Sequence, residues 1–119
     1  MVSTPPPWRA VVIEQLETLA SENEQLQYER NVSHVDITAE LVCGWFDDSY
    51  HPGDIRFRSC FTDEELAALA EFNAVFKSCI PRLPKRTGTV RTWLASASWR
   101  EVMDAAATAL DRMSGRGAR

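Results

Sequence analysis

The strongest helix signal in the chain is Phe61-Thr62-Asp63-Glu64-Glu65-Leu66. Thr62 and Glu65 stand at the N-cap and N3 positions of a capping box, and the flanking apolar residues have the spacing of a hydrophobic staple. The two acidic residues inside the box fall in the first turn, where the helix dipole favours negative charge. The stretch therefore predicts a helix that starts after Thr62, and apolar residues at helical spacing continue it to about Ser78.

The same apolar period recurs along the chain and predicts an all-α fold. We expect one globular domain over residues 1–119, built from four to five amphipathic helices. The first helix starts near Pro7 and ends between residues 23 and 29, and a further capping box at Ser21 leaves a break there as an alternative. The other predicted helices cover residues 38–48 with Thr38 as N-cap, 62–78, 89–95, and 99–113 after a Ser98 N-cap.

Three segments are expected to lie outside these helices. Val32, Val35 and Ile37 leave a short strand over residues 31–37, and with it a small α+β fold, as the alternative architecture. Residues 47–54 are dense in turn formers and predict a loop, which Ile55 and Phe57 would anchor to the core. Residues 1–6 and 114–119 are expected to fray.

Charge is divided unevenly along the chain. Residues 1–65 contain 13 acidic and 4 basic residues, whereas residues 66–119 contain 4 acidic and 9 basic ones. An asymmetry of this size affects partner choice and association rate rather than fold. The acidic residues concentrate on the first helix and on the 47–54 loop, so we expect an acidic surface that attracts a basic protein.

Motifs for catalysis, cofactors or metals do not stand out. The chain has no glycine-rich phosphate loop and no GxSxG, and its three cysteines are widely spaced without a CxxC. Cys43 and Cys79 lie in apolar runs and are expected in the core. We expect no enzyme activity, no cofactor and no metal.

Targeting signals are absent as well. No segment reads as a signal peptide or a membrane span, which predicts a cytoplasmic protein without membrane contact.

Two other functions are weighed against partner binding. Asp47, Asp48, Asp54 and His51 would serve a small metal-dependent hydrolase, although this loop fails the EF-hand pattern. A helical adaptor or regulator that forms a homodimer through exposed apolar surface is the third hypothesis.

A basic set with interleaved tryptophans would suit nucleic acid, but the sequence pI of about 5.1 speaks against that partner. The set consists of Arg82, Lys85, Arg86, Arg91 and Arg100, with Trp93 and Trp99.

The stretch from Glu40 to Pro52, ELVCGWFDDSYHP, followed by FTDEEL from Phe61 to Leu66, resembles small bacterial immunity proteins of contact-dependent growth-inhibition and other polymorphic toxin systems. The resemblance covers about residues 38–112. It implies a cytoplasmic protein that neutralises a cognate toxin, often a basic nuclease, by occluding its active site. It assigns no residue roles.

The leading hypothesis is therefore a non-enzymatic immunity protein that occludes a basic toxin domain with an acidic surface. Rim charges would set the association rate, and a few apolar anchors would hold the complex. The predicted carboxylates are Glu14, Glu17, Glu40, Asp47, Asp48 and Asp54, and the predicted anchors are Tyr50 and Phe57.

Overall fold

Helices make up all the regular structure among the residues that the computed structural model describes, which are 8–32, 36–84 and 89–114. The all-α prediction is confirmed, but this part of the chain forms seven α-helices instead of four or five. A π-helical segment continues α3, and a 3-10 turn continues α5. In chain order the elements are α1 (Trp8–Ala20), α2 (Glu22–Asn31), α3 (Ile37–Cys43), η1 (Gly44–Ser49), α4 (Ile55–Arg58), α5 (Asp63–Cys79), η2 (Ile80–Arg82), α6 (Val90–Leu94) and α7 (Ala97–Ser114).

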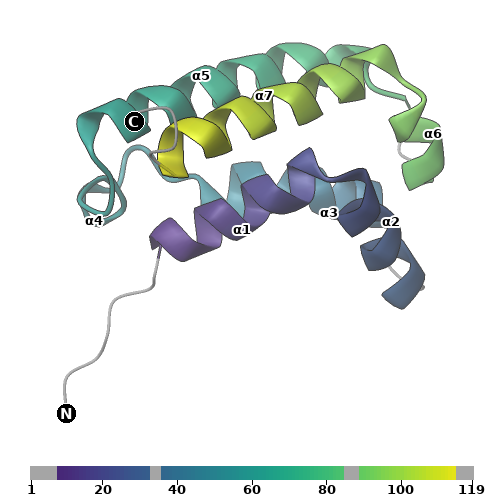
Figure 1. The fold of residues 1–119 in the computed structure, drawn as a ribbon, viewed down its shortest axis with the longest axis horizontal. Helices are drawn as coiled ribbons and strands as arrows, with labels where there is room; N and C mark the ends of the chain where they lie inside the picture. Colours follow the sequence, from purple (N-terminus) through teal and green to yellow (C-terminus); the bar gives the residue numbers. More distant parts are fainter. Residues whose placement is uncertain (1–7, 33–35, 85–88, 115–119) are drawn as a thin grey trace.

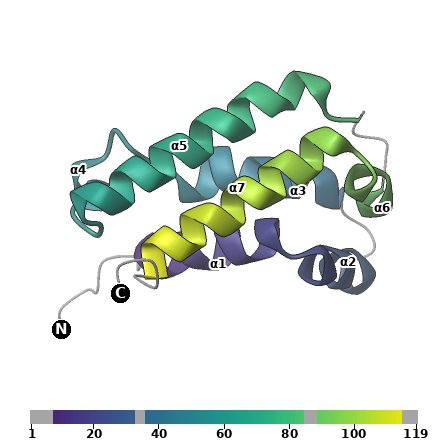
Figure 2. The same cartoon turned by 45° about the horizontal axis from the view of Figure 1, so that its top comes forward.

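The long helix α7 lies at the centre of the arrangement. It runs antiparallel to α5 on one side and packs along α1 on the other (Figure 1). The α3 segment lies behind α7, between α5 and α1 (Figure 2). Helices α2 and α6 contact each other at one end of the molecule. None of the helices in the described ranges has the length and apolar character needed to span a membrane.

Aromatic side chains fill the space between these helices. Phe72 of α5 packs edge-on against Trp45 of η1, with ring centroids 4.7 Å apart. Phe76, one turn further along α5, lies 5.9 Å from Trp99 of α7, and Trp99 lies 4.9 Å from Trp93 of α6. All five side chains are buried, so η1, α5, α6 and α7 contribute the apolar faces that their sequence spacing predicted.

The predicted break at Ser21 is present. The Ser21 Oγ accepts the Glu24 backbone N–H at 3.1 Å, which ends α1 and starts α2 in a new direction. The capping box at the start of α5 is also present, with both of its hydrogen bonds formed between Thr62 and Glu65. Thr89 caps α6 as the predicted 89–95 helix requires.

Two predicted N-caps are wrong by two residues. Asp36, not Thr38, caps α3: its carboxylate accepts the Ala39 backbone N–H at 3.2 Å, while the Thr38 hydroxyl is buried and donates to the same carboxylate at 2.7 Å. At α7 the Ser96 Oγ accepts the Trp99 backbone N–H, so the helix starts before Ser98. In both cases a competing capping side chain two residues upstream forms the bond.

The segment after residue 50 differs from the predicted loop anchor. Ile55 is 75% exposed, and Phe57 alone carries the short helix α4 into the core at 0% exposure. Cys43 is exposed rather than buried, whereas Cys79 is buried as predicted. A four-residue helix is too short for its sequence to define an apolar face, which explains the wrong assignment of Ile55.

The strand alternative is contradicted at both of its ends, because Asn31 ends α2 and Ile37 begins α3. Residues 33–35, in its middle, lie outside the described residues. The segments predicted to fray were 1–6 and 114–119. Residues 1–6 and 115–119 lie outside the described residues, whereas Ser114 is the last residue of α7.

Candidate functional site

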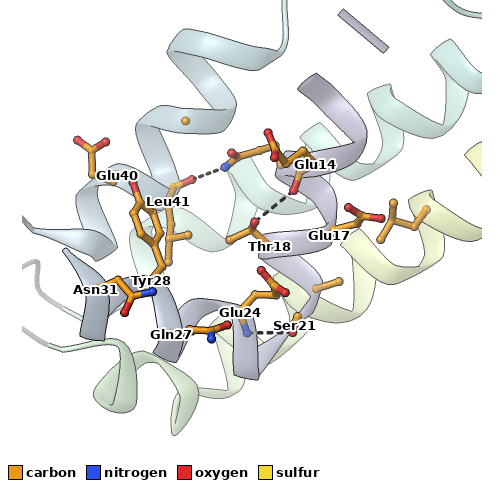
Figure 3. Close-up of a pocket in the computed structure, with 14 residues that line it drawn as sticks. Glu14, Glu17, Thr18, Ser21, Glu24, Gln27, Tyr28, Asn31, Glu40 and Leu41 are labelled. Carbon is orange, nitrogen blue, oxygen red and sulfur yellow. Dashed lines mark hydrogen bonds between the residues drawn. The ribbon is translucent and has the colours of Figure 1, made fainter. Parts of the chain in front are cut away.

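A groove of about 850 Å³ lies between α1, α2 and α3 (Figure 3). Four carboxylates line it: Glu14 and Glu17 from α1, Glu24 from α2 and Glu40 from α3. Glu17 lies at the edge that faces α7, and Tyr28 of α2 stands between the α2 and α3 walls. The groove therefore gathers negative charge from three helices. Its most distant carboxylates in the sequence, Glu14 and Glu40, are 26 residues apart.

Helix α1 turns its carboxylates toward the groove because its other face is needed for the core. Val12, Leu16 and Leu19 are fully buried at helical spacing. Glu14 and Glu17 fall between them and are exposed. The acidic side of the groove is thus a direct consequence of the apolar period of α1.

Helix α2 is held in place by a buried glutamine. The Gln25 Nε2 donates to the backbone oxygens of Thr18 and Leu19, each at 3.1 Å, and its Oε1 accepts the Trp99 indole N–H at 2.9 Å. Gln25 is completely buried. It joins the end of α1, the start of α2 and the middle of the core, and so it fixes the wall that carries Glu24.

The α3 wall is positioned by a close approach to α1. The Gln15 Nε2 donates to the Leu41 backbone oxygen at 3.4 Å. A Cβ on Gly44 would lie 2.9 Å from the same nitrogen, so glycine leaves the space that this side chain occupies. The missing side chain of Gly44 thereby sets the spacing between Glu14 and Glu40.

The acidic charge of the groove is not neutralised by the described cations. The groove lining contains no lysine or arginine among the described residues, and no ion pair of the described part reaches its four carboxylates. Five arginines of the described part pair with other carboxylates. The pairs are Arg9–Glu65, Arg56–Asp54, Arg82–Glu101, Arg100–Glu22 and Arg112–Glu71.

Asp47 and Asp48 lie on η1 and extend the negative charge beyond the groove. The pKa of the Cys43 thiol is raised by desolvation and then by the nearby charge of Asp47, with smaller contributions from Glu40 and Asp48. Three carboxylates therefore lie within electrostatic reach of Cys43, and Glu40 is both one of these and part of the groove lining. Asp47, Asp48 and the groove form one acidic surface.

The other predicted site residues have structural roles. The Asp54 carboxylate caps α4 by accepting the Arg56 backbone N–H at 2.8 Å, and this bond lowers its pKa. Phe57 is fully buried, so its side chain is not on the surface where a partner anchor would stand. Tyr50 is half-buried and stacks on Trp45 with centroids 4.8 Å apart, and its burial raises the pKa of its hydroxyl.

His51 is engaged within the fold. Its ring packs 5.0 Å from the Trp8 ring, and its Nε2 is 3.1 Å from the Asp48 backbone oxygen. Over residues 8–32, 36–84 and 89–114, no three His, Cys, Asp or Glu side chains gather in a way that could hold a metal ion.

The basic set proposed for nucleic acid does not form an aromatic platform. Trp93 and Trp99 are 2% and 0% exposed, so neither ring can stack on a base. Arg82 and Arg100 are paired with carboxylates. Lys85 and Arg86 lie outside the described residues.

Comparisons with protein-family models, with curated proteins and with solved structures returned no match. The resemblance to immunity proteins therefore remains a hypothesis. Sequence reasoning had placed Glu24 on the acidic first helix without assigning it to the site. It also missed Tyr28 and Gln25. The capping box at Ser21 was the signal that α2 would turn and form a second wall.

Proposed function

We propose that this chain is a non-enzymatic binding protein that occludes a basic segment of another protein in the groove between α1, α2 and α3. The observation that carries the proposal is the set of four groove carboxylates, which come from three helices and have no described cation as a partner. Unpaired charge in a concave surface focuses the electrostatic field on an approaching partner.

The mechanism is steric and electrostatic. The acidic surface accelerates encounter with a basic partner, and insertion of the partner's basic side chains into the groove blocks whatever surface carries them. A toxin domain whose active site is basic, such as a nuclease, fits this requirement. The resemblance to immunity proteins supports the same assignment, with a cytoplasmic toxin domain as the partner.

Binding to the polypeptide encoded by the neighbouring reading frame is the direct test. Purified partner and chain are mixed in a stopped-flow instrument at several salt concentrations. We expect rapid association that slows as salt rises, because the Debye length falls from ~10 Å at 0.1 M to ~3 Å at 1 M. Absence of binding would overturn the assignment as an immunity protein.

Matched charge variants separate the groove from the overall charge. Glu14→Gln with Glu40→Gln removes two charges from opposite walls, whereas Glu64→Gln with Asp104→Asn removes two exposed charges that do not line the groove. We expect the first pair to slow association about tenfold and the second to change it less than twofold. Equal slowing by the two pairs of substitutions would mean that association depends on the total charge of the chain and not on the groove.

The η1 carboxylates are tested in the same assay. Asp47→Asn with Asp48→Asn should slow association by a smaller factor than the groove pair, because both lie outside the groove lining. Unchanged association would remove η1 from the binding surface and restrict the proposal to the groove.

A further inference from the structure

A second concave site lies on the other side of α3 from the groove. Its volume is about 280 Å³, at the lower limit for small-molecule pockets, which suits a single large side chain. We call it the α3–α6 pocket. It is lined by Ala39, Val42, Cys43, Ile80, Leu83, Pro84 and Trp93.

The two sites share α3 as a common wall. Glu40 and Leu41 of α3, together with Gly44 at the start of η1, line the groove. Ala39, Val42 and Cys43 of α3 line the α3–α6 pocket. Different faces of the same short helix therefore line an acidic site and an apolar one. A partner segment that crosses α3 can reach both.

Acidic charge borders the pocket. Cys43 is exposed at the pocket, and its thiol lies within electrostatic reach of Asp47, Glu40 and Asp48. A second copy of this chain would bring the same carboxylates against these, and like charges oppose that contact. A basic segment has the complementary charge.

Trp93 adds an unpaired polar group next to the pocket. Its side chain is 2% exposed, and its Nε1–H is the one buried side-chain nitrogen or oxygen of the described part without a hydrogen-bond partner. The indole N–H groups of Trp45 and Trp99, in contrast, each donate to a side-chain oxygen. Buried polar groups normally find a hydrogen-bond partner, so this donor is an exception among the buried side-chain groups of the described part.

We propose that the α3–α6 pocket holds one large apolar side chain of the same basic segment that the groove binds. The proposal rests on the proposed function and defines its partner more closely: a segment with lysines or arginines for the groove and one leucine, methionine or aromatic residue for the pocket. The pocket takes the role of apolar anchor that the buried Phe57 cannot fill.

The test uses a random peptide library displayed on phage, selected against the whole chain. We expect enriched peptides that combine several basic residues with one large apolar residue. Replacing that residue by alanine in a synthetic peptide should weaken binding about 10- to 100-fold, the effect of burying one large apolar side chain. This substitution lies in the peptide and leaves the fold of the chain untouched.

A filled pocket provides the reciprocal measurement. Cys43→Phe adds a large side chain at an exposed lining position, and Ala67→Phe makes an equal addition at an exposed position outside the pocket. Cys43→Phe should weaken binding of the selected peptide by the same factor as the alanine substitution in the peptide. The two changes combined should weaken binding no further than either alone, and Ala67→Phe should leave the affinity unchanged. Peptide binding should also shift the indole N–H resonance of Trp93, which is identified by its loss in Trp93→Phe.

The other outcomes overturn the proposal in distinguishable ways. The enriched peptides could be basic, lack an apolar residue and bind Cys43→Phe normally. This result would show that the pocket is not a binding site, and it would leave the proposed function unaffected. Apolar peptides that ignore Glu14→Gln with Glu40→Gln would separate the pocket from the groove and remove the shared partner. Enrichment of no peptide would remove both. A dimer in sedimentation that Cys43→Phe dissociates would make a second copy the occupant.

Discussion

Replacement of Gln25 by methionine tests the contact that joins the groove to the core. The side chain is fully buried and uses both ends of its amide, with two donated bonds to Thr18 and Leu19 and one accepted bond from Trp99. Methionine has a similar shape and no hydrogen-bonding amide, so the substitution removes the three bonds with little change in volume.

The expected cost follows from the groups that lose their partners. The Trp99 indole N–H becomes a buried donor without an acceptor, which costs about 1–3 kcal/mol. The Leu19 backbone oxygen loses the hydrogen bond from Gln25, which costs about 1 kcal/mol more. The Thr18 backbone oxygen adds no such cost, because it still accepts the Ser21 backbone N–H at 3.3 Å. Burial of the apolar methionine returns ~1 kcal/mol. We therefore expect the free energy of unfolding to fall by about 1–3 kcal/mol.

Urea unfolding followed by tryptophan fluorescence measures this loss, with Gln27→Met as the control at an exposed position on the same helix. A double-mutant cycle with Trp99→Phe isolates the indole contact and should give a coupling of about 1–2 kcal/mol. A loss below ~0.5 kcal/mol for Gln25→Met, or a coupling of zero, would refute the reasoning. Peptide binding in the groove should weaken in the same variant, because Gln25 holds the α2 wall.

Three further substitutions test other contacts. The hydrogen bond from Arg9 lowers the pKa of the Glu65 carboxyl below its ordinary 4.5. The stability that this bond provides is therefore complete above pH 4.5 and is lost as the pH falls through the lowered pKa. Arg9→Gln should make the free energy of unfolding, measured by urea titration at successive pH values, depend less on pH in this acidic range. Phe57→Ala should lower the free energy of unfolding by about 3–5 kcal/mol, and a loss near zero would return Phe57 to the list of surface anchors. Gly44→Ala should raise stability by up to ~1 kcal/mol only in a Gln15→Ala background, because the new Cβ otherwise displaces the Gln15 amide; equal effects in both backgrounds would contradict the close approach.

Local signals in the sequence were reliable where one hydrogen bond determines the backbone. The N-cap bond at Ser21 and the full capping box at Thr62 both form, because the side chain and the backbone N–H that they join are three residues apart and need no tertiary contact. The wrong N-caps at Thr38 and Ser98 arose where two capping residues compete within two positions. Such competition is decided by the packing of the whole helix.

The groove was only partly predictable for a different reason. The apolar period of α1 placed Glu14 and Glu17 on its exposed face, and this holds from the sequence alone. That Glu40 lies opposite them depends on the glycine at position 44 and on the contact from Gln15. Helix-to-helix spacing of this kind is a non-local property, and periodicity along one helix does not contain it.

In the part of the chain that the structure describes, the five ion pairs named above take up little of the charge asymmetry of the sequence. Among the ion pairs of the described residues, Arg100–Glu22 is the one that joins residues 1–65 to residues 66–119. The other pairs stay within one half: Arg9–Glu65, Arg56–Asp54, Arg82–Glu101 and Arg112–Glu71. Each exposed ion pair contributes only ~0–1 kcal/mol, so pairing between the two halves would add little to stability. No ion pair of the described residues involves the four groove carboxylates, and the proposed function uses them for recognition. Neutralisation of the groove is therefore the experiment on which the proposed function depends.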